Sequence, residues 1–313
     1  LHPWAEMVRY TRSGGEAMCL AVRIARAYNK KDVVAFCGYH GWHDWYLAAN
    51  LNSKTNLDQH LMAGLEPRGV PKGLRNTAFP FRYNNIDDLN KIISKNKGKV
   101  SAIIMEPIRY NNPEPDFFKE IKTICSKEDI LLVIDEISAG FRVCAGGAHK
   151  KINVEPDIAV FSKALGNGYP IAAVIGKREP MQSCQSSFIS STMWSERIGP
   201  TAALTTIKKF VELEAHKHIV KIGEEVKLGW KKAAEESELD ITIYNGIAPL
   251  SSFSWNYKNN LEIKSYFIQL MLEKNFLASN QFYSSYSHTF DHVEKYIDAV
   301  KIAFKEIKKT LES

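Results

Sequence analysis

The stretch 156–175, PDIAVFSKALGNGYPIAAVI, constrains the fold of this chain more than any other part. It holds two apolar runs, 158–161 and 171–175, each with the length and composition of a buried strand. Lys163 stands between the two runs, where an ammonium group is costly to bury unless it is paired or neutralised. The pattern predicts two strands joined by a tight turn, with a lysine that either extends to solvent or reacts with a carbonyl group to form an imine.

An acidic pair follows another apolar run earlier in the chain. Residues 131–134 read Leu-Leu-Val-Ile, and Asp135 and Glu136 come directly after them. Parallel strands of an α/β protein end at one edge of the sheet, and ligand sites form at that edge. Because Asp135 and Lys163 each follow a buried strand, we expect both to belong to one site at the carboxyl edge of the sheet.

Strand-like and helical patterns alternate over the first two thirds of the chain, which predicts a largely parallel, doubly wound α/β sheet. Residues 50–85 interrupt this alternation and are expected to form a long surface loop. A helical region with a break follows Pro200, and the remainder predicts a smaller α+β unit. We therefore expect a large domain, 1–205, and a second part, 206–313, that contains the connecting helix and the small domain. The expected strands are 7–10, 33–36, 100–105, 131–135, 158–161, 171–175, 241–244, 251–255 and 282–286.

Two glycines open the first expected helix, in the sequence Ser13-Gly14-Gly15-Glu16. Ser13 fits an N-cap, and Glu16 three residues later would complete a capping box. A second interpretation is that backbone amides exposed by the glycines hold a phosphate. The segment is not a P-loop, because no Gly-Lys-Ser or Gly-Lys-Thr follows.

Aromatic residues and histidines are concentrated in the loop 38–45, which reads GYHGWHDW. These side chains either pack on the core or stack on a planar ligand. His40, His43 and Asp44 could also bind a metal, but no further cluster of ligands accompanies them, and this interpretation is disfavoured.

Composition excludes several other classes of function. The net charge of +6 is spread along the chain instead of forming a basic stripe, so no nucleic-acid partner is expected. The five cysteines are scattered without a CxxC pair, which indicates neither a disulfide framework nor a zinc ribbon and favours a cytoplasmic location. No apolar run approaches the roughly 20 residues that span a membrane, and no signal peptide is apparent.

Taken together, six ordered segments resemble class III (subgroup II) aminotransferases, a family of fold-type I pyridoxal-phosphate enzymes. They are similar in particular to the glutamate-1-semialdehyde aminomutase branch. The segments are SGGEA at 13–17, GYHGWH at 38–43, EP at 106–107, IDEISAGFR at 134–142, FSKALGNGYP at 161–170 and SERIGP at 195–200.

The resemblance implies a mostly parallel seven-stranded sheet sandwiched by helices, with a smaller C-terminal α+β domain. It implies pyridoxal phosphate as cofactor, a small-molecule amino donor and a carbonyl acceptor as substrates, and a homodimer with composite active sites. Transamination would then follow a ping-pong mechanism.

The resemblance also assigns roles to individual residues. Lys163 matches the lysine that forms the internal aldimine and moves a proton during the reaction. Asp135 matches the aspartate that keeps the pyridine nitrogen protonated. The other cofactor contacts that it implies are Ser13, Gly14 and Gly15 at the phosphate, Tyr39 on the ring with His40 beside it, Ser138 near the ring hydroxyl, and Ser195, which is usually donated by the neighbouring subunit. Glu106 matches a structural or site-lining glutamate.

The chain departs from the family pattern at several positions. Gly15 stands where the family usually has serine or threonine, and Ser138 replaces glutamine or methionine. The segment 194–200 lacks the glycine-rich pattern of a true aminomutase, which favours an aminotransferase acting on another amine, such as a modified sugar or sugar acid. Arg197 could bind a substrate carboxylate or form an interface ion pair, and the second is favoured.

Two alternatives to an aminotransferase stay open, and the start of the chain bears on the second of them. It has no initiator methionine and enters a strand at once, so we expect it to lack the family's N-terminal segment, which helps to form the substrate pocket. One alternative is an aminomutase that transfers an amino group within one molecule. The other is a non-catalytic scaffold, suggested by Gly15 and the shortened start but opposed by the presence of both Lys163 and Asp135.

Overall fold

The computed structural model describes residues 1–192 and 195–312. Trp194, which belongs to the segment predicted to differ from an aminomutase, lies outside the described residues. The chain divides into two compact units. Unit 1 comprises Leu1–Pro107 and Pro113–Lys209, and unit 2 comprises Ile108–Asn112 and the residues from Phe210 onward.

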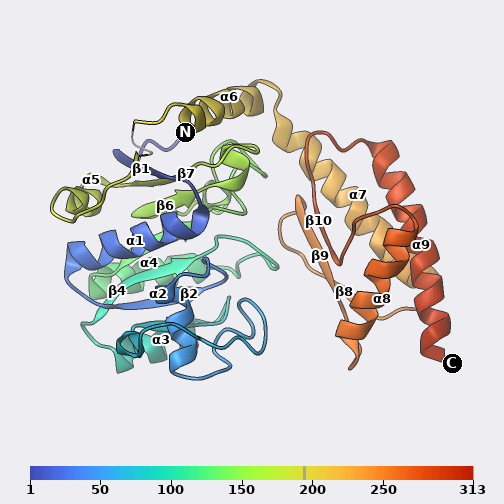
Figure 1. The fold of residues 1–313 in the computed structure, drawn as a ribbon, viewed down its shortest axis with the longest axis horizontal. Helices are drawn as coiled ribbons and strands as arrows, with labels where there is room; N and C mark the ends of the chain where they lie inside the picture. Colours follow the sequence, from blue (N-terminus) through green and yellow to red (C-terminus); the bar gives the residue numbers. More distant parts are fainter. Residues whose placement is uncertain (193–194, 313) are drawn as a thin grey trace. The chain divides into compact units, whose positions relative to one another are not determined.

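Unit 1 is built on a seven-stranded sheet with the order β1-β7-β6-β5-β4-β2-β3 (Figure 1). The strands β2 to β6 run parallel, whereas β7 is antiparallel to both of its neighbours, so β1 again has the direction of β2 to β6. This confirms the predicted mostly parallel sheet. The strands are β1 (Met7–Thr11), β2 (Val33–Cys37), β3 (Ala78–Pro80), β4 (Val100–Met105), β5 (Leu131–Asp135), β6 (Ile158–Phe161) and β7 (Ala172–Gly176).

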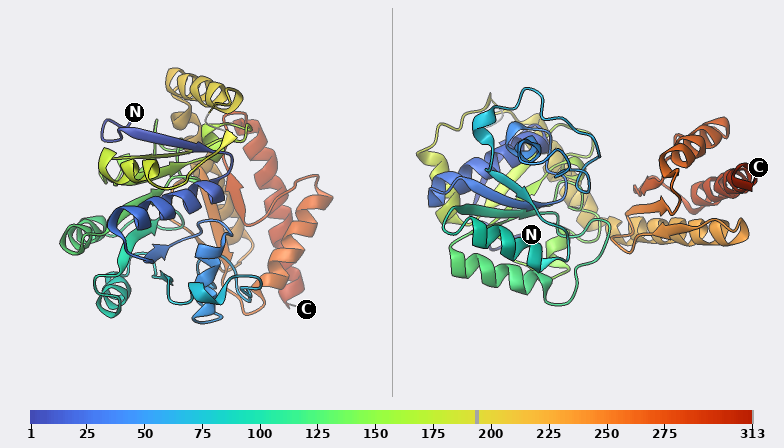
Figure 2. Two further views of the ribbon diagram at one scale, coloured as in Figure 1. Left: turned by 60° about the vertical axis from the view of Figure 1, so that its left-hand side comes forward. Right: turned by 90° about the horizontal axis from the view of Figure 1, so that it is seen from below.

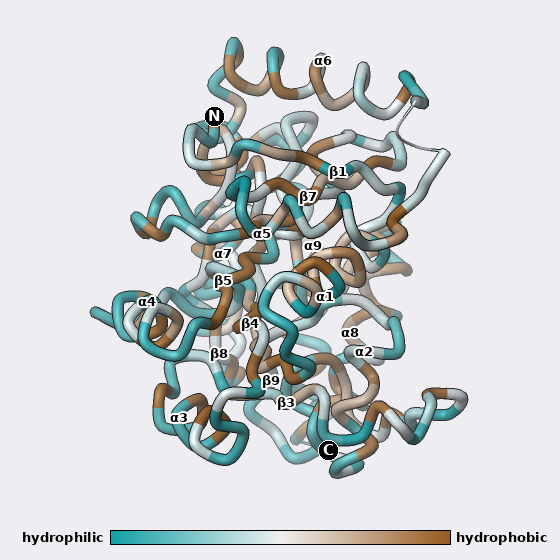
Figure 3. Tube along the Cα trace, turned by 90° about the vertical axis from the view of Figure 1, so that its left-hand side faces the viewer, coloured by the Kyte–Doolittle hydropathy of each residue, from teal (hydrophilic) through white to brown (hydrophobic). Residues whose placement is uncertain are grey.

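Helices cover both faces of this sheet (Figure 2). One face packs against α1 (Gly14–Asn29), α2 (Asp44–Leu47) and α5 (Arg178–Gln182), and the other packs against α3 (Ile86–Lys95) and α4 (Phe117–Glu128). The strands are therefore buried on both sides, which explains why β5 reads as a continuous apolar run instead of an alternating one. The central strands β4 and β5 carry hydrophobic residues along their length (Figure 3).

Alternation along β5 still decides which side chain faces which helix layer. Leu131 and Val133 pack in the core on the α1 side, whereas Leu132 and Ile134 pack on the α4 side. Asp135 has the parity of Leu131 and Val133. The strand therefore ends with a carboxylate on the face that α1 covers.

The predicted surface loop 50–85 was only partly right. Its last part contains β3, which pairs with β2 in parallel register, with Val34 opposite Ala78. Ala78 and Leu57 are fully buried. A three-residue edge strand that ends in Pro80 is too short for an alternating pattern, and proline is tolerated at an edge. The described part of unit 1 also contains short 3-10 turns: η1 (Ala48–Leu51), η2 (Lys72–Leu74), η3 (Ala148–Lys150), η4 (Lys163–Leu165) and η5 (Ser183–Gln185).

Helix α6 (Ile198–Glu212) ends near the division between the units, and α7 (Ala215–Glu236) follows after Glu214, which has a left-handed backbone. This is the predicted break in the helical region. Unit 2 combines α7, α8 (Asn260–Glu273) and α9 (Phe290–Glu312) with an antiparallel sheet of order β10-β9-β8. Its strands are β8 (Ile241–Ile243), β9 (Leu250–Trp255) and β10 (Gln281–Tyr283).

The core of unit 2 is formed by aromatic side chains that pack edge to face. The Trp230 and Phe253 rings lie 4.9 Å apart at 67°, and both residues are fully buried. The Trp230 indole N–H donates to the Tyr296 hydroxyl at 3.0 Å. Across residues 1–192 and 195–312, no helix is long and apolar enough to cross a membrane.

Candidate active site

Polar residues gather at the carboxyl edge of the large sheet, because β1, β2, β4, β5 and β6 all end there. Each strand is followed by a segment that carries predicted site residues. In chain order these are Ser13 to Gly15 after β1, Tyr39 and His40 after β2, Glu106 after β4, Asp135 and Ser138 at the end of β5, and Lys163 after β6. The topology thus brings together residues that are far apart in sequence, as predicted for Asp135 and Lys163.

Lys163 begins η4, with only Ser162 between it and the buried strand β6. Its φ of 47° lies in the left-handed region, which non-glycine residues rarely adopt and which is common at functional sites. Its side chain is exposed rather than buried between the strands, and its ammonium donates to the Ser138 hydroxyl at 2.8 Å. Lys163 therefore projects from the sheet edge. This agrees with the predicted alternative in which the lysine extends to solvent.

Asp135 and His40 form a buried pair at the same edge. The His40 Nδ1 lies 2.7 Å from the Asp135 Oδ2, and the two residues are 0% and 2% exposed. The His40 Nε2 lies 3.1 Å from the carbonyl oxygen of Cys37, and the Asp135 Oδ1 accepts the Ile137 N–H at 2.9 Å. Both ring nitrogens face oxygens that accept hydrogen bonds, so neither is left for a metal.

The N-terminus of α1 differs in one detail from the predicted capping box. The Ser13 hydroxyl accepts the Glu16 N–H at 3.3 Å, as expected, but the Glu16 carboxylate accepts the Arg12 N–H at 3.0 Å instead of the Ser13 N–H. Within the described part of the chain, the N–H groups of Gly14 and Gly15 meet no acceptor. The first turn of α1 therefore presents two open donors at the sheet edge.

Close backbone contacts fix this helix end against the rest of the site. A Cβ added to Gly14 would lie 2.8 Å from Ile137, and one added to Gly41 would lie 2.9 Å from the Gly15 Cα. Gly14 and Gly15, which we call the glycine turn, thus pack between the segment after β5 and the loop after β2. Side chains at these positions would force the three segments apart.

Glu106 holds the start of the loop after β2. It is 5% exposed, and its Oε2 accepts the Tyr39 N–H at 3.4 Å. Gly38 has a φ of 113°, and a Cβ there would lie 2.6 Å from the same carboxylate oxygen. The half-buried Tyr39 ring packs edge-on against Tyr46, at 5.9 Å between centroids.

Ser195 and Arg197 lie outside this group in the described chain. Both are exposed, and the Ser195 hydroxyl donates to the carbonyl oxygen of Thr192 at 3.3 Å. They precede α6, whose apolar residues Ile198 and Leu204 are also exposed, and hydrophobic residues recur along this helix (Figure 3).

Sequence reasoning missed a second buried histidine–carboxylate pair. The Glu136 side chain is fully buried, and its Oε1 lies 2.6 Å from the His149 Nδ1. It also accepts the backbone N–H groups of Ala148 and His149 at 3.0 and 2.8 Å. The only signal in the sequence was a second acid at the end of an apolar strand, and nothing marked its partner.

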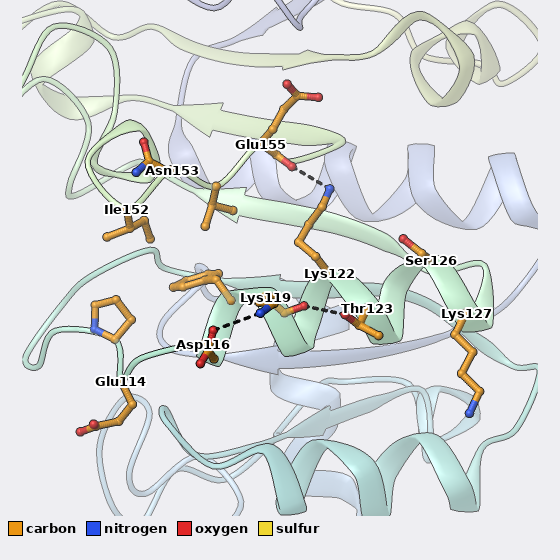
Figure 4. A pocket seen from close by; sticks show the side chains of 13 residues that line it. Glu114, Asp116, Lys119, Lys122, Thr123, Ser126, Lys127, Ile152, Asn153 and Glu155 are labelled. Atoms are coloured by element: carbon orange, nitrogen blue, oxygen red, sulfur yellow. Dashed lines mark hydrogen bonds and ion pairs between the residues drawn. The ribbon is translucent and has the colours of Figure 1, made fainter.

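A separate hollow lies on the outer side of α4 (Figure 4) and contains none of the predicted site residues. Two of its three lysines are directed at protein oxygens: Lys122 donates to the Glu155 carbonyl at 2.8 Å, and Lys119 lies 3.6 Å from the Asp116 carboxylate. We therefore assign no cofactor to it.

The sheet order, the lysine after β6 and the aspartate at the end of β5 define an α/β enzyme of the fold shared by pyridoxal-phosphate transaminases. Residues 1–243 match the family model for class-III aminotransferases, and the chain belongs to that family.

Relatives of known name support this assignment. A 3-aminobutyryl-CoA aminotransferase of Cloacimonas acidaminovorans is 32% identical, over 99% of this chain and 74% of its own length. A glutamate-1-semialdehyde 2,1-aminomutase of Caldicellulosiruptor saccharolyticus is 30% identical, over 97% of this chain and 75% of its own.

Solved structures show the same fold. A transaminase with bound pyridoxal phosphate superimposes with a TM-score of 0.88 at 21% identity, over all of this chain and 76% of that one. An omega-transaminase from Sphaerobacter thermophilus gives 0.86 at 20% identity, over 98% of this chain and 75% of that one.

The residues at the sheet edge fit the cofactor of this family, pyridoxal phosphate. Asp135 is a buried carboxylate suited to a ring nitrogen, and Lys163 presents an amine suited to an aldehyde. The open amides of Gly14 and Gly15 suit a phosphate at a helix N-terminus.

Proposed function

We propose that this protein transfers an amino group between a small amine and a carbonyl compound in two half-reactions, with Lys163 as the residue that attaches to the cofactor. One observation carries this proposal: the buried Asp135 carboxylate ends β5, and the Lys163 amine stands just past the end of the adjacent parallel strand β6, at the same sheet edge. A structural scaffold has no need of this arrangement.

Lys163 is proposed to hold the cofactor and to move a proton at the substrate carbon. An amine must be deprotonated to attack a carbonyl and to act as a base. The contact of its Nζ with the Ser138 hydroxyl, at 2.8 Å, supports a role of Ser138 in orienting this amine.

Asp135 is proposed to bind the protonated ring nitrogen of the cofactor. When bound, pyridoxal phosphate supplies a ring that accepts electrons from the substrate carbon. The His40 and Ile137 hydrogen bonds to the two carboxylate oxygens keep Asp135 in place and oriented. His40 is therefore a positioning residue in this proposal.

The remaining contacts are proposed to come from the glycine turn, the loop after β2 and a neighbouring subunit. Gly14 and Gly15 would bind the phosphate through their amides, and Tyr39 would cover the ring. The exposed Ser195 and the exposed apolar residues of α6 support a homodimer in which Ser195 reaches the partner's phosphate site.

The first experiment tests the lysine attachment. The protein is incubated with pyridoxal phosphate and reduced with borohydride, and its peptides are analysed by mass spectrometry. After unbound cofactor is removed, we expect the cofactor on Lys163, and in Lys163→Ala only a weak label spread over exposed lysines. A protein that binds no cofactor at all would sink the proposal and favour the scaffold alternative.

The second experiment identifies the amino donor. The loaded enzyme is mixed with a panel of amines, among them amino sugars, amino acids and β-amino thioesters, and the change in the cofactor's absorption shows which of them react. Inclusion of thioesters is motivated by the relative named 3-aminobutyryl-CoA aminotransferase.

An aminomutase is the second candidate, favoured by relatives of that name at 30–31% identity. It predicts turnover of a single amino-aldehyde without a second amino donor. If turnover requires an external donor such as glutamate, the aminomutase candidate is excluded.

A further inference from the structure

We propose that His43 is a phosphate-binding residue of this protein, with its Nδ1 as the side-chain donor to the cofactor's phosphate. The inference rests on the proposed function, because it presumes a phosphate at the N-terminus of α1. It assigns to His43 a role that the sequence patterns did not suggest.

The His43 imidazole has a buried nitrogen without a partner. Its Nδ1 is shielded from solvent, and no hydrogen-bonding group of the described chain meets it. A buried donor or acceptor left unpaired costs free energy, so this nitrogen favours a ligand that can pair with it.

The ring lies directly against the glycine turn. A Cβ built on Gly15 would lie 2.9 Å from the His43 Cε1 and 3.0 Å from its Nδ1. The imidazole therefore fills the space that a side chain at position 15 would occupy. Gly15 and His43 are complementary: the helix supplies no side chain there, and the loop after β2 supplies one.

Local structure does not account for the orientation of the ring. His43 occupies the N-cap position of α2, but its side chain makes no capping hydrogen bond. Its backbone carbonyl accepts the Tyr46 N–H at 2.9 Å, which any residue could do. The ring is stacked on Trp42, at 4.8 Å and 16°, and this contact fixes its plane without using its nitrogens.

Three donors thus gather at the first turn of α1: the N–H groups of Gly14 and Gly15 and, when it carries the proton, the His43 Nδ1. The positive end of the helix dipole favours an anion at the same place. A phosphate oxygen that accepts from the imidazole would give this buried nitrogen a partner, and such charge-assisted bonds are stronger than neutral ones.

The test compares two ligands that differ only in the phosphate, pyridoxal phosphate and pyridoxal. Dissociation constants are measured for the wild type, His43→Ala and His43→Asn, whose amide nitrogen can take the place of Nδ1. We expect His43→Ala to weaken pyridoxal phosphate binding about 10- to 100-fold, the range of one hydrogen bond to a charged group. Pyridoxal should bind within about twofold of wild type, and His43→Asn should restore most of the loss.

Two results would overturn the inference and leave the proposed function intact. One is unchanged pyridoxal phosphate affinity in His43→Ala. The other is an equal loss for both ligands, which would mean that the ring only shapes the site. A wild type that binds neither ligand would instead remove the proposed function itself.

A residue exchange provides an independent check. Gly15→Ser alone should weaken pyridoxal phosphate binding, because its Cβ would clash with the imidazole. In Gly15→Ser combined with His43→Ala, the serine gains both the space and the position to donate a hydroxyl, so the double variant should bind more tightly than either single variant. Additive losses would contradict the complementarity of the two residues.

Discussion

Asp135 and Glu136 are adjacent in sequence, and both are buried beside a histidine, at 2.7 and 2.6 Å. Their other partners differ. Asp135 faces His40 and one backbone N–H, whereas Glu136 accepts two backbone N–H groups and the His149 ring. The first pair lies among the candidate site residues, and the second fixes the turn before β6. Neighbouring acids thus acquire different roles because successive residues leave a strand toward different partners.

The largest effect is expected from Asp135→Asn. The amide keeps an acceptor for the Ile137 N–H, and His40 can accept from the new amide while its Nε2 donates to Cys37, so the fold should tolerate the change. Loss of the carboxylate from the cofactor's ring nitrogen should lower kcat/KM by roughly 10²- to 10⁴-fold. Steady-state kinetics at saturating cofactor, with urea unfolding as a control, measure the two effects. Near-normal activity would remove Asp135 from the chemistry.

Glu136→Gln should lower stability, whereas Asp135→Asn should mainly lower activity. Backbone N–H groups cannot change their protonation, so the new amide must place donors against Ala148 N, His149 N or the His149 ring. We expect a loss of roughly 3 kcal/mol in the free energy of unfolding, as when one partner of a buried pair is removed. The exposed Glu120→Gln is the matched control and should stay within about 0.5 kcal/mol. Equal stabilities of the two variants would refute the assigned role of Glu136.

Substitutions of His40 and His149 should also differ, with activity reduced in one and stability in the other, but by smaller amounts. His40→Gln should lower kcat/KM about tenfold, because the Asp135 carboxylate loses a charge-assisted hydrogen bond that orients it. His149→Gln should cost about 1 kcal/mol of stability, since the backbone contacts to Glu136 remain. Steady-state kinetics and urea unfolding on both variants measure the two effects. A tenfold activity loss in His149→Gln would mean that the two histidine–carboxylate pairs do not differ in role.

The effect that is smallest at neutral pH concerns the titration of a histidine near the second pair. The His2 ring stacks on His149 at 5.3 Å, and burial, aided by His149 and Lys150, lowers the pKa of His2 from 6.5 to about 3. A histidine that is harder to protonate when folded binds fewer protons in the folded state, so stability falls as the pH drops from 6.5 toward 3.

His2→Phe keeps a ring for the stack and removes the titration. Urea midpoints measured across this pH range should decline less steeply in the variant than in the wild type. An identical decline in both proteins would show that His2 does not contribute.

Much of the large unit could be predicted because its signals are local. Long apolar runs buried on both faces marked β4, β5 and β6, and their order in the chain predicted a parallel sheet with Asp135 and Lys163 at one edge. The Ser13 cap was also predictable, since its partner lies three residues away.

Features that depend on distant partners could not be predicted. Strand β3 exists only because Ala78 pairs with Val34 of β2, and three residues carry no period of their own. His149 joins Glu136 across a turn that no local pattern marks. The contact of His43 with Gly15 arises where a loop crosses a helix end.

The sequence alone thus determined the class of fold, the family and the two charged residues at the ends of β5 and β6, because these follow from hydrophobic runs and from residue order. Only the tertiary structure decided which histidine each of the two acids meets, which ring nitrogens are paired, and which side chain occupies the space beside Gly15. These contacts join segments that are far apart in the chain. Such segments come within hydrogen-bonding distance only when the chain folds, so no local sequence pattern marks them.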